Sequence, residues 1–496
     1  MRLGLRVSAV NGLPPTESVQ ATLGADPLLH AHGAIRNARH GGKGGKGGKG
    51  PRMQWVPNQQ SPAAIATYQE SLLRNILAPL ASLLSGVGML VVGTGLLFAA
   101  IGAQASSAHF SALVTGLIMS AYFAGFVYGT YACPTLIRRF GHIRAFASMA
   151  TVASALPIMH ALWINPWAWG VLRFVTGVCL VGLYIVVESW LNVVATSQQR
   201  GKVFAAYMAV NGVALALGQW LILVGDRYGF VPFALVSILF SFAMLPITLT
   251  PVKEPVPTNA PKLGLFELFF ISPIGVIGAV GSGLLNGAFF SLGTVFAQGV
   301  GFSEGGTATF MAATILGGAV FQWPVGHLSD RHDRRRVLFL VCALSAAVAL
   351  AGYFMAQGNE MLLIGLGVVY GGLSFSIYGL SVAHVNDLID PSRVLEVTGG
   401  LLLLYGIGAT VGPTLGGAMM DWMGSEALML YFAGLLALLV LAIWRYSIHS
   451  TPHPDAHAVK SDYVVMGSGS QAVLQMDPRL HPAPVAPEAS NSVPPT

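Results

Sequence analysis

Apolar runs of about 20 residues alternate with short polar breaks along the chain from Ile76 onward. A helix of that length crosses roughly 30 Å of hydrocarbon, which is the thickness of a bilayer core. Twelve runs fit this description, at approximately 76–102, 110–134, 143–163, 166–192, 202–225, 231–250, 272–298, 305–325, 336–356, 361–386, 394–420 and 427–446. The pattern therefore predicts an all-α membrane protein with twelve transmembrane helices.

The second half of this pattern repeats the first. Leu136–Gly141, after the second run, aligns with Leu328–Asp333, after the eighth, at an offset of 192 residues. Gly212 in the fifth run matches Gly406 in the eleventh at an offset of 194 residues. Two parallel copies of a six-helix unit form one transporter architecture. We therefore predict two pseudosymmetric six-helix bundles around a central cavity.

Polar segments flank and separate the two bundles. The first contains a Gly-Gly-Lys repeat at 41–49 and lacks the apolar residues that would offset its chain entropy. No cleavable signal peptide is recognisable in the first 75 residues, and Met53 is a second candidate start. The predicted parts are a disordered cytoplasmic tail at 1–72, bundles at 73–250 and 272–446, a cytoplasmic linker at 251–271 and a disordered cytoplasmic tail at 447–496.

Composition and charge agree with a membrane protein. Hydrophobic residues make up 54% of the chain and charged residues only 9%, against about a quarter charged in soluble domains. If the amino terminus is inside, Arg227 is the one basic residue of the outer loops. The inner loops then hold Arg138, Arg139, Arg144, Arg200, Lys202, Lys253, Lys262, Arg331, Arg334, Arg335, Arg336 and Arg393. This bias predicts that both termini are cytoplasmic, and it makes the lipid bilayer, not nucleic acid, the expected partner.

The most charged run of the hydrophobic body is Gly326–Arg336, between the eighth and ninth predicted helices. It resembles the loop signature of the major facilitator superfamily, Gly-x-Leu-x-Asp-Arg-x-Gly-Arg-Lys. The matching residues are Gly326, Leu328, Asp330, Arg331, Arg334 and Arg335, and Asp333 replaces the second glycine. The first copy, after the second helix, keeps Leu136, Arg139 and Gly141, with Arg144 just beyond, but has Arg138 in place of the acid.

A second stretch narrows the resemblance. Arg173–Asn192, with Arg200-Gly-Lys, Ala206-Tyr-Met and Gly218-Gln219, is similar to the YcaD-like branch of that superfamily. Members of this branch are bacterial inner-membrane transporters whose substrates are mostly unassigned. The resemblance implies an inner-membrane location, a small-molecule substrate and rocking of the two bundles around a midplane site.

The charged loops have two interpretations, a topology signal or a cytoplasmic latch between the halves, which the resemblance implies for the outward-open state. We expect Asp330 to pair with nearby arginines, because an acid adds little to the topology signal. Glu188 and Asp387 lie near the cytoplasmic ends of the fourth and tenth helices. They are either solvated or paired, Glu188 with Arg139 or Arg144 and Asp387 with Arg331 or Arg334. The predicted latch set is Gly326, Asp330, Arg331, Arg334, Arg335, Arg139, Gly141, Arg144, Glu188 and Asp387.

Polar residues inside the apolar runs are candidates for a substrate cavity. Arg173 lies about seven residues into the fourth helix, where a cation costs a few kcal/mol. It either binds an anionic group or modulates protonation, or it is a structural residue held by carbonyl groups. The other candidates are Tyr122, Tyr184, Asn286, Gln298, Gln322, Tyr370 and Tyr378, each of which could instead bond a neighbouring helix. Together they predict a partly aromatic cavity suited to an amphiphilic organic solute.

Small residues mark close helix contacts. Gly125-x-x-x-Gly129 in the second helix and Gly408-x-x-x-Gly412-Pro413-x-x-Gly416 in the eleventh allow backbones to approach. Pro413 removes one backbone donor and should bend its helix. Packing explains these residues, and a bend that flexes during rocking is the further hypothesis.

Other chemistry is not indicated. The sequence has no GxxxxGK[ST] phosphate loop and no HExxH motif, and its three cysteines show no CxxC spacing. We expect no metal, no cofactor and no enzymatic activity. We predict a monomeric secondary transporter, an exporter or ion-coupled porter, with a proton as one possible coupling ion. An uptake porter and a non-transporting receptor or scaffold that keeps the fold are the alternatives.

Overall fold

The computed structural model describes residues 78–195, 199–226, 228–250, 265–449, 463–464 and 474, all within one compact unit, Ala64–Thr496. Most of these residues are helical, and none of them lies in a strand. Twelve helical segments among them are long and apolar enough to cross a membrane. The predicted all-α fold with twelve transmembrane helices is therefore confirmed. The predicted tail at 1–72 and most of that at 447–496 lie outside the described residues.

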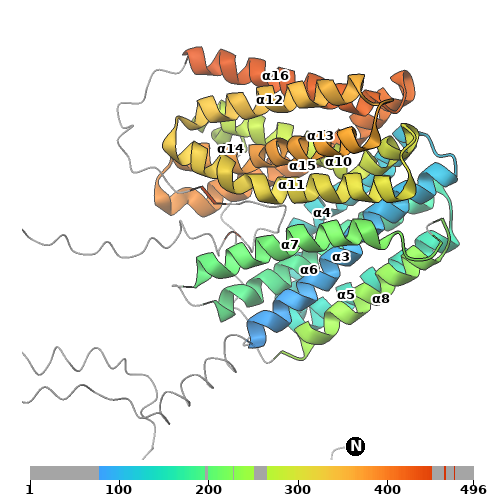
Figure 1. The fold of residues 1–496 in the computed structure, drawn as a ribbon. Helices are drawn as coiled ribbons and strands as arrows, with labels where there is room; N and C mark the ends of the chain where they lie inside the picture. The colour runs from blue at the N-terminus through green and yellow to red at the C-terminus, as the bar shows by residue number, and fades with distance from the viewer. Residues whose placement is uncertain are drawn as a thin grey trace, which may run out of the picture. The chain divides into compact units, whose positions relative to one another are not determined.

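Six long helices form the amino half (Figure 1). They are α3 (Ala78–Ser107), α4 (Ala112–Phe140), α5 (His142–Leu162), α6 (Pro166–Val194), α7 (Arg200–Leu221) and α8 (Val231–Thr248). The predicted linker ends in a short helix, α9 (Leu265–Ile271), and its first part, 251–264, lies outside the described residues.

The carboxyl half repeats the pattern with one interruption. Its elements are α10 (Pro273–Gly299), α11 (Glu304–Arg331), α12 (Arg334–Phe354), α13 (Glu360–Ser374), α14 (Ser376–Asn386), the 3₁₀ turn η3 (Pro391–Arg393), α15 (Val394–Met423) and α16 (Ala427–His449). The run predicted as one helix at 361–386 is divided at Phe375, so that α13 and α14 together form the tenth span.

Local sequence sets where several helices begin. At five helix starts, a side-chain oxygen accepts a hydrogen bond from a backbone N–H of the first turn. The capping residues are Ser111 for α4, Asn165 for α6, Ser272 for α10, Ser303 for α11 and Asn359 for α13. These bonds satisfy donors that a helix start leaves without a partner. A proline at the first position of α6 and α10 fits the same role, because that position needs no donor.

Two helices extend beyond their apolar runs. α4 continues to Phe140 and α11 to Arg331, about a turn and a half past the predicted ends at 134 and 325. Both extensions carry arginines in the last turn, where a cation interacts favourably with the carboxyl-terminal end of the helix dipole. Hydropathy marks the end of the apolar segment, and the helix itself ends later.

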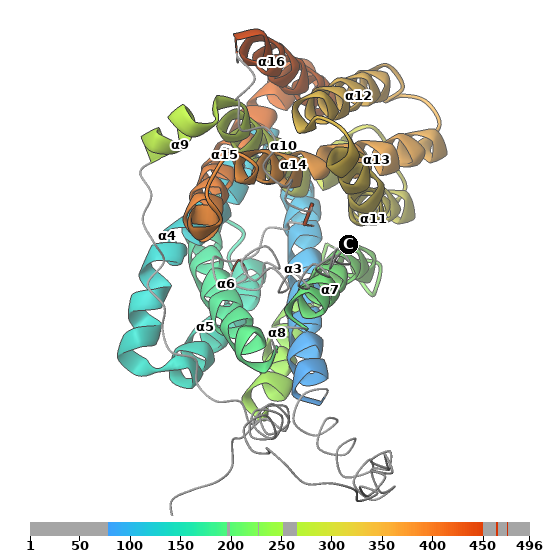
Figure 2. The same cartoon turned by 90° about the vertical axis from the view of Figure 1, so that its left-hand side faces the viewer.

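The two halves meet mainly along two pairs of helices. α4 packs against α15, and α7 packs against α11, as the two views show (Figures 1 and 2). Within the halves, α4 packs on α6 and α10 packs on α15. The helices α4 and α15 therefore each contact both halves, and a relative movement of the halves must change the contact between them.

Candidate functional site

A cavity of about 690 Å³ lies between the two halves. Its walls come from α3, α4, α6 and α7 of the amino half and from α10, α11, α14 and α15 of the carboxyl half. Most of the lining is apolar and aromatic, and no acidic, basic or histidine side chain among the described residues lines it. Its polar groups are the side chains of Thr94, Tyr122, Thr130, Tyr184, Tyr207, Asn211, Asn286, Gln322, Tyr378, Tyr405 and Tyr463. The size is that of a pocket for a drug-sized molecule.

Several of the residues proposed from sequence for a cavity line this one, namely Tyr122, Tyr184, Asn286, Gln322 and Tyr378. Asn286 donates to the Tyr405 hydroxyl at 3.4 Å, and the Tyr378 and Tyr405 rings lie 5.0 Å apart, so these groups form one polar, aromatic side of the cavity.

Two other candidates lie elsewhere, which corrects the prediction for them. The Tyr370 ring stacks on Phe432 of α16 with centroids 5.1 Å apart, and Tyr370 is absent from the cavity wall. Gln298 lies beside a separate small pocket with Gln219. The sequence could not exclude either residue, because the lipid face and the packed faces of these helices are all apolar and their orientation is not encoded in hydropathy.

Arg173 lies one aromatic ring away from the cavity. Its guanidinium packs over Tyr122 at 4.4 Å and over Phe98 at 4.7 Å from the ring centroids, and both rings line the cavity. The residue is 1% exposed, and within the described part of the chain its Nε and Nη2 have no hydrogen-bond partner and it forms no ion pair. Two cation–π contacts thus hold a buried cation behind the cavity wall. Direct contact with a solute stays a prediction.

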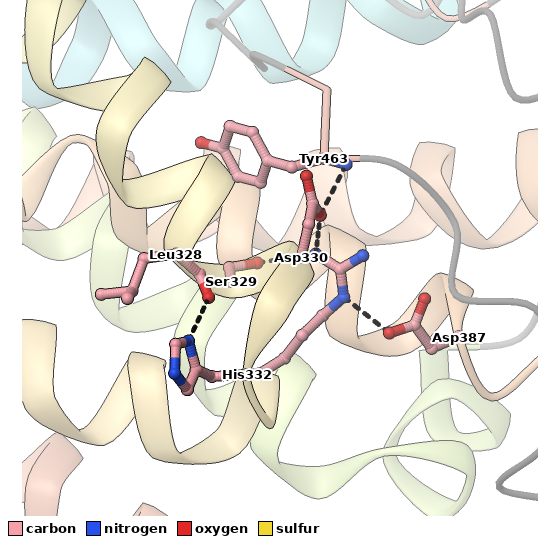
Figure 3. Close-up of polar contacts among 7 residues, drawn as sticks. Leu328, Ser329, Asp330, His332, Asp387 and Tyr463 are labelled. Atoms are coloured by element: carbon pink, nitrogen blue, oxygen red, sulfur yellow. Dashed lines mark hydrogen bonds and ion pairs between the residues drawn. The ribbon is translucent and has the colours of Figure 1, made fainter.

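One group of charged residues comes together at the end of the molecule where the arginine-rich loops lie, hereafter the basic end. The Arg334 Nε lies 2.6 Å from Asp387 Oδ2, and its Nη1 lies 3.2 Å from Asp330 Oδ1 and 2.7 Å from Ser329 Oγ (Figure 3). Arg334 is 2% exposed. These four residues, the charge cluster, tie α11, α12 and the end of α14 together within the carboxyl half.

The remaining arginines of this loop do not join the charge cluster. Arg331 is exposed and Arg335 half-buried, and neither forms an ion pair within the described part of the chain. Of the two arginines expected near Asp387, Arg334 is therefore the one that reaches it. Gly326 is not part of the charge cluster and lies against the ring of Tyr463.

The corresponding loop of the amino half is arranged differently. Arg139 and Arg144 are exposed and form no ion pair with a described residue, and Arg139 lies over the ring of its neighbour Phe140. Glu188 is fully buried and accepts a 2.6 Å hydrogen bond from the Tyr207 hydroxyl. Of the two alternatives for Glu188, the carboxylate is buried and not solvated, and it does not pair with Arg139 or Arg144, because both guanidinium groups are exposed.

Gly141 and Arg393 lie at other turns of the basic end. Gly141 has a φ of 83° and ends α4, donating its N–H to the Ile137 carbonyl oxygen at 2.8 Å, a conformation that suits glycine. Arg393 lies 2.6 Å from Glu267, which connects η3 to α9, and this bond raises the pKa of Arg393. Because both side chains are largely exposed, the ion pair contributes little stability.

The opposite end of the cavity is closed by a contact between the halves. Asp421, near the end of α15, accepts the backbone N–H of Ala112 at 2.8 Å and that of Leu113 at 3.2 Å. These are first-turn donors of α4, where a carboxylate is favoured by both the free N–H groups and the helix dipole. A side chain of the carboxyl half therefore caps a helix of the amino half.

Small residues extend this closure toward the cavity. Ser120 and Thr414 share a 2.9 Å hydrogen bond between α4 and α15. A Cβ at Gly116 would collide with the Pro413 carbonyl oxygen, so the two backbones are in direct contact there. Sequence reasoning missed this contact. Asp421 follows the last predicted residue of its run, and an acid at that place is indistinguishable from a solvated helix end.

The glycines predicted to mediate packing lie within each half. A Cβ at Gly125 or Gly129 would collide with α6, and a Cβ at Gly408 or Gly412 would collide with the backbone of α10. Gly416 faces apolar side chains of α10 and α16. These contacts fix the positions of α4 and α15, the two helices that also meet at the closed end.

Comparison with known proteins decides the family. The model of the Major Facilitator Superfamily matches residues 83–319 and 275–487. The chain belongs to the Major Facilitator Superfamily. It is 28% identical over 386 residues to YcaD, an MFS-type transporter of Escherichia coli O17:K52:H18, covering 76% of this chain and 98% of that protein. It is 29% identical over 347 residues to an MFS-type transporter of Enterobacter sp. (strain 638), covering 69% and 89%. The predicted membership of the YcaD branch is thus confirmed.

Solved transporters of the superfamily have the same fold. The nucleoside transporter NupG aligns with a TM-score of 0.64 at 14% identity, covering 75% of this chain and all of NupG. An inward-facing, occupied structure of a bacterial homologue of the human lysosomal transporter Spinster aligns with a TM-score of 0.62 at 14% identity, covering 74% and 95%. At such identities the likeness shows the fold alone. With its family, the chain is a multi-pass inner-membrane transporter of a small solute.

Proposed function

We propose that this MFS transporter is a secondary transporter that carries a small organic amphiphile through the central cavity by rocking alternating access. The supporting observation is a cavity walled by both halves and sealed, away from the basic end, by contacts between those halves. Separation of α4 from α15 there would open the other side. The solute class follows from the wall, which offers aromatic and apolar surface with a few hydroxyl and amide groups and no charge among the described residues.

We place the basic end in the cytoplasm, because arginines of short loops gather there. The cavity reaches that end, since Gly201 at the start of α7 and Leu402 in the third turn of α15 line it. An exporter would load its solute from this end, and an uptake porter would release it there. Export, alone or coupled to an ion, is the direction we propose. The described cavity wall has no carboxylate or histidine. A coupling proton would therefore be carried by the solute itself or by a group outside the cavity.

The proposal is tested with the full chain in proteoliposomes, using a panel of organic solutes with and without an imposed pH gradient. We expect at least one amphiphile to cross, and Ala209→Trp to slow it by about tenfold or more. Ala209 lies on the cavity wall, where an indole would fill the solute space. Ala347→Trp is the matched control, because Ala347 is an exposed residue of α12 away from the cavity.

The outcomes separate the alternatives. Transport only with the gradient indicates coupling, whereas equal transport without it indicates facilitated movement. Unchanged transport by Ala209→Trp would show that the cavity is not the route. A panel in which the wild-type chain moves nothing would favour a receptor or scaffold that keeps the fold.

A further inference from the structure

Two residues of the carboxyl-terminal segment lie in the central cavity. Tyr463 and Val464 follow the end of α16 in the chain, yet both line the cavity together with residues of α11 and α14. The backbone N–H of Tyr463 donates to Asp330 Oδ1 at 3.0 Å (Figure 3). Tyr463 is therefore bonded to the charge cluster, at the end where the cavity is not closed by α4 and α15.

The surface that receives Tyr463 is formed by two glycines. A Cβ at Gly326 of α11 would collide with the Tyr463 ring, and a Cβ at Gly379 of α14 would collide with its hydroxyl oxygen. Any other residue at either position would displace the ring or the helix. The two helices thus present a flat surface on which an aromatic ring lies in direct contact with the backbone.

The described residues beyond α16 pack against apolar residues of both halves. Val464 is 7% exposed and Leu474 is 3% exposed, and both belong to an apolar cluster built mainly from helices of the amino half. Tyr463 packs against the apolar cluster of the carboxyl half. Tyr463 and Val464 therefore occupy space between the halves, which would have to approach each other at the basic end if the molecule rocked.

We propose that Tyr463 and Val464 form an internal plug, with Tyr463 seated on Gly326 and Gly379 as its anchor, and that these two residues must leave before the basic end closes or a solute loads. The proposal rests on the proposed transport function. Because the plug is tethered only a short chain length beyond α16, its effective concentration at the cavity is on the order of millimolar. It would compete with the amphiphilic solute for the same aromatic wall.

The test measures access to the cavity and needs no solute. Ala319 lines the cavity and lies seven residues, about 10 Å along α11, from Gly326. Ala319→Cys in the full chain is labelled with fluorescein maleimide in detergent, against a background of three native cysteines that are all buried. Gln357→Cys, in an exposed loop at the opposite end, reports the intrinsic rate of labelling.

Two full-length variants then remove the anchor from opposite sides. Tyr463→Ala deletes the ring, and Gly379→Val fills its seat. We expect each to raise labelling of Ala319→Cys by at least about fivefold, with labelling of Gln357→Cys unchanged. Gly434→Val is the matched control for the glycine substitution, because nothing lies within 4 Å of a Cβ at Gly434.

Equal labelling of Ala319→Cys with and without the anchor would overturn the plug. If one variant loses its fold, the other still decides, since the two changes lie on different segments. Labelling is independent of transport, so the plug can fail while the solute panel succeeds. Conversely, if labelling rises in both variants but no solute is transported, the plug is supported and only the transport proposal is rejected.

Discussion

The two copies of the arginine-rich loop have the same place in their halves but different structures. In the carboxyl half, Arg334 is buried and held by Asp330 and Asp387. In the amino half, Arg139 is exposed, and Arg138, in the place of the acid, is exposed with its guanidinium bonded to Thr135. Both loops can orient the chain, because orientation needs only positive charge. A defined ionic contact also needs the acid, which one copy retains.

The difference extends to the acids of the adjacent helices. Asp387 lies 2.6 Å from the Arg334 guanidinium, and Glu188 accepts a hydrogen bond from the Tyr207 hydroxyl. Arg334 is buried and also binds Asp330, whereas Arg139 of the other loop is exposed. The carboxyl half is therefore the one in which a single substitution at the loop should be felt most.

The largest effect is expected for Arg334→Met. The substitution leaves Asp330 and Asp387, both partly buried, without their shared cation, and it should lower stability by roughly 2–4 kcal/mol. The measurement is the apparent melting temperature of the purified chain in detergent. Arg336→Met is the control, because Arg336 is exposed on the same helix. Equal melting of the two variants would show that the charge cluster does not stabilise the half.

An intermediate effect is expected for Asp330→Asn. It removes one ion pair of Arg334 but keeps an oxygen that can accept the Tyr463 N–H, so we expect a loss of about 1–2 kcal/mol. If Asp330 also acts in a latch, solute turnover per molecule should fall more than protein level. Asp333→Asn is the matched control, since Asp333 caps α12 and asparagine caps a helix equally well. Wild-type turnover at normal expression would count against a latch.

The smallest effect is expected for Arg139→Gln in the amino half. The guanidinium is exposed and its described contact is the neighbouring Phe140 ring, so stability should change by no more than about 0.5 kcal/mol. The same melting assay and a turnover measurement check this. A decrease as large as that of Arg334→Met would remove the asymmetry between the two loops.

The sequence predicts the fold well because its strongest signals are local. Runs of apolar residues locate the twelve helices, and the loop signature locates both copies of the repeat. Asp330, Arg334 and Asp387 could be proposed as partners because they lie near helix ends on the same predicted side. Which arginine is buried could not be predicted, since Arg331 and Arg334 are three residues apart, yet one ends α11 and the other begins α12, a boundary that hydropathy does not locate.

Long-range contacts account for what the sequence did not predict. Helices that are apolar on every side give no indication of which face meets a cavity, so Tyr370 could not be separated from Tyr378. Asp421 binds backbone groups some 300 residues away, and Tyr463 lies in a polar tail that composition alone predicts to be disordered. The partners of Asp421 are backbone N–H groups, and the ring of Tyr463 lies on two glycines. Neither kind of partner has a side chain for a pattern to reveal.

The cap that Asp421 places on α4 has an unusual genetic property. Its donors are the peptide N–H groups of Ala112 and Leu113, which every amino acid except proline supplies. Mutations on α4 can therefore alter the surroundings of this bond but rarely the bond itself, whereas one codon on α15 controls all of it. A screen for chains that stay open at this end should thus return changes at residue 421 far more often than changes at 112 or 113.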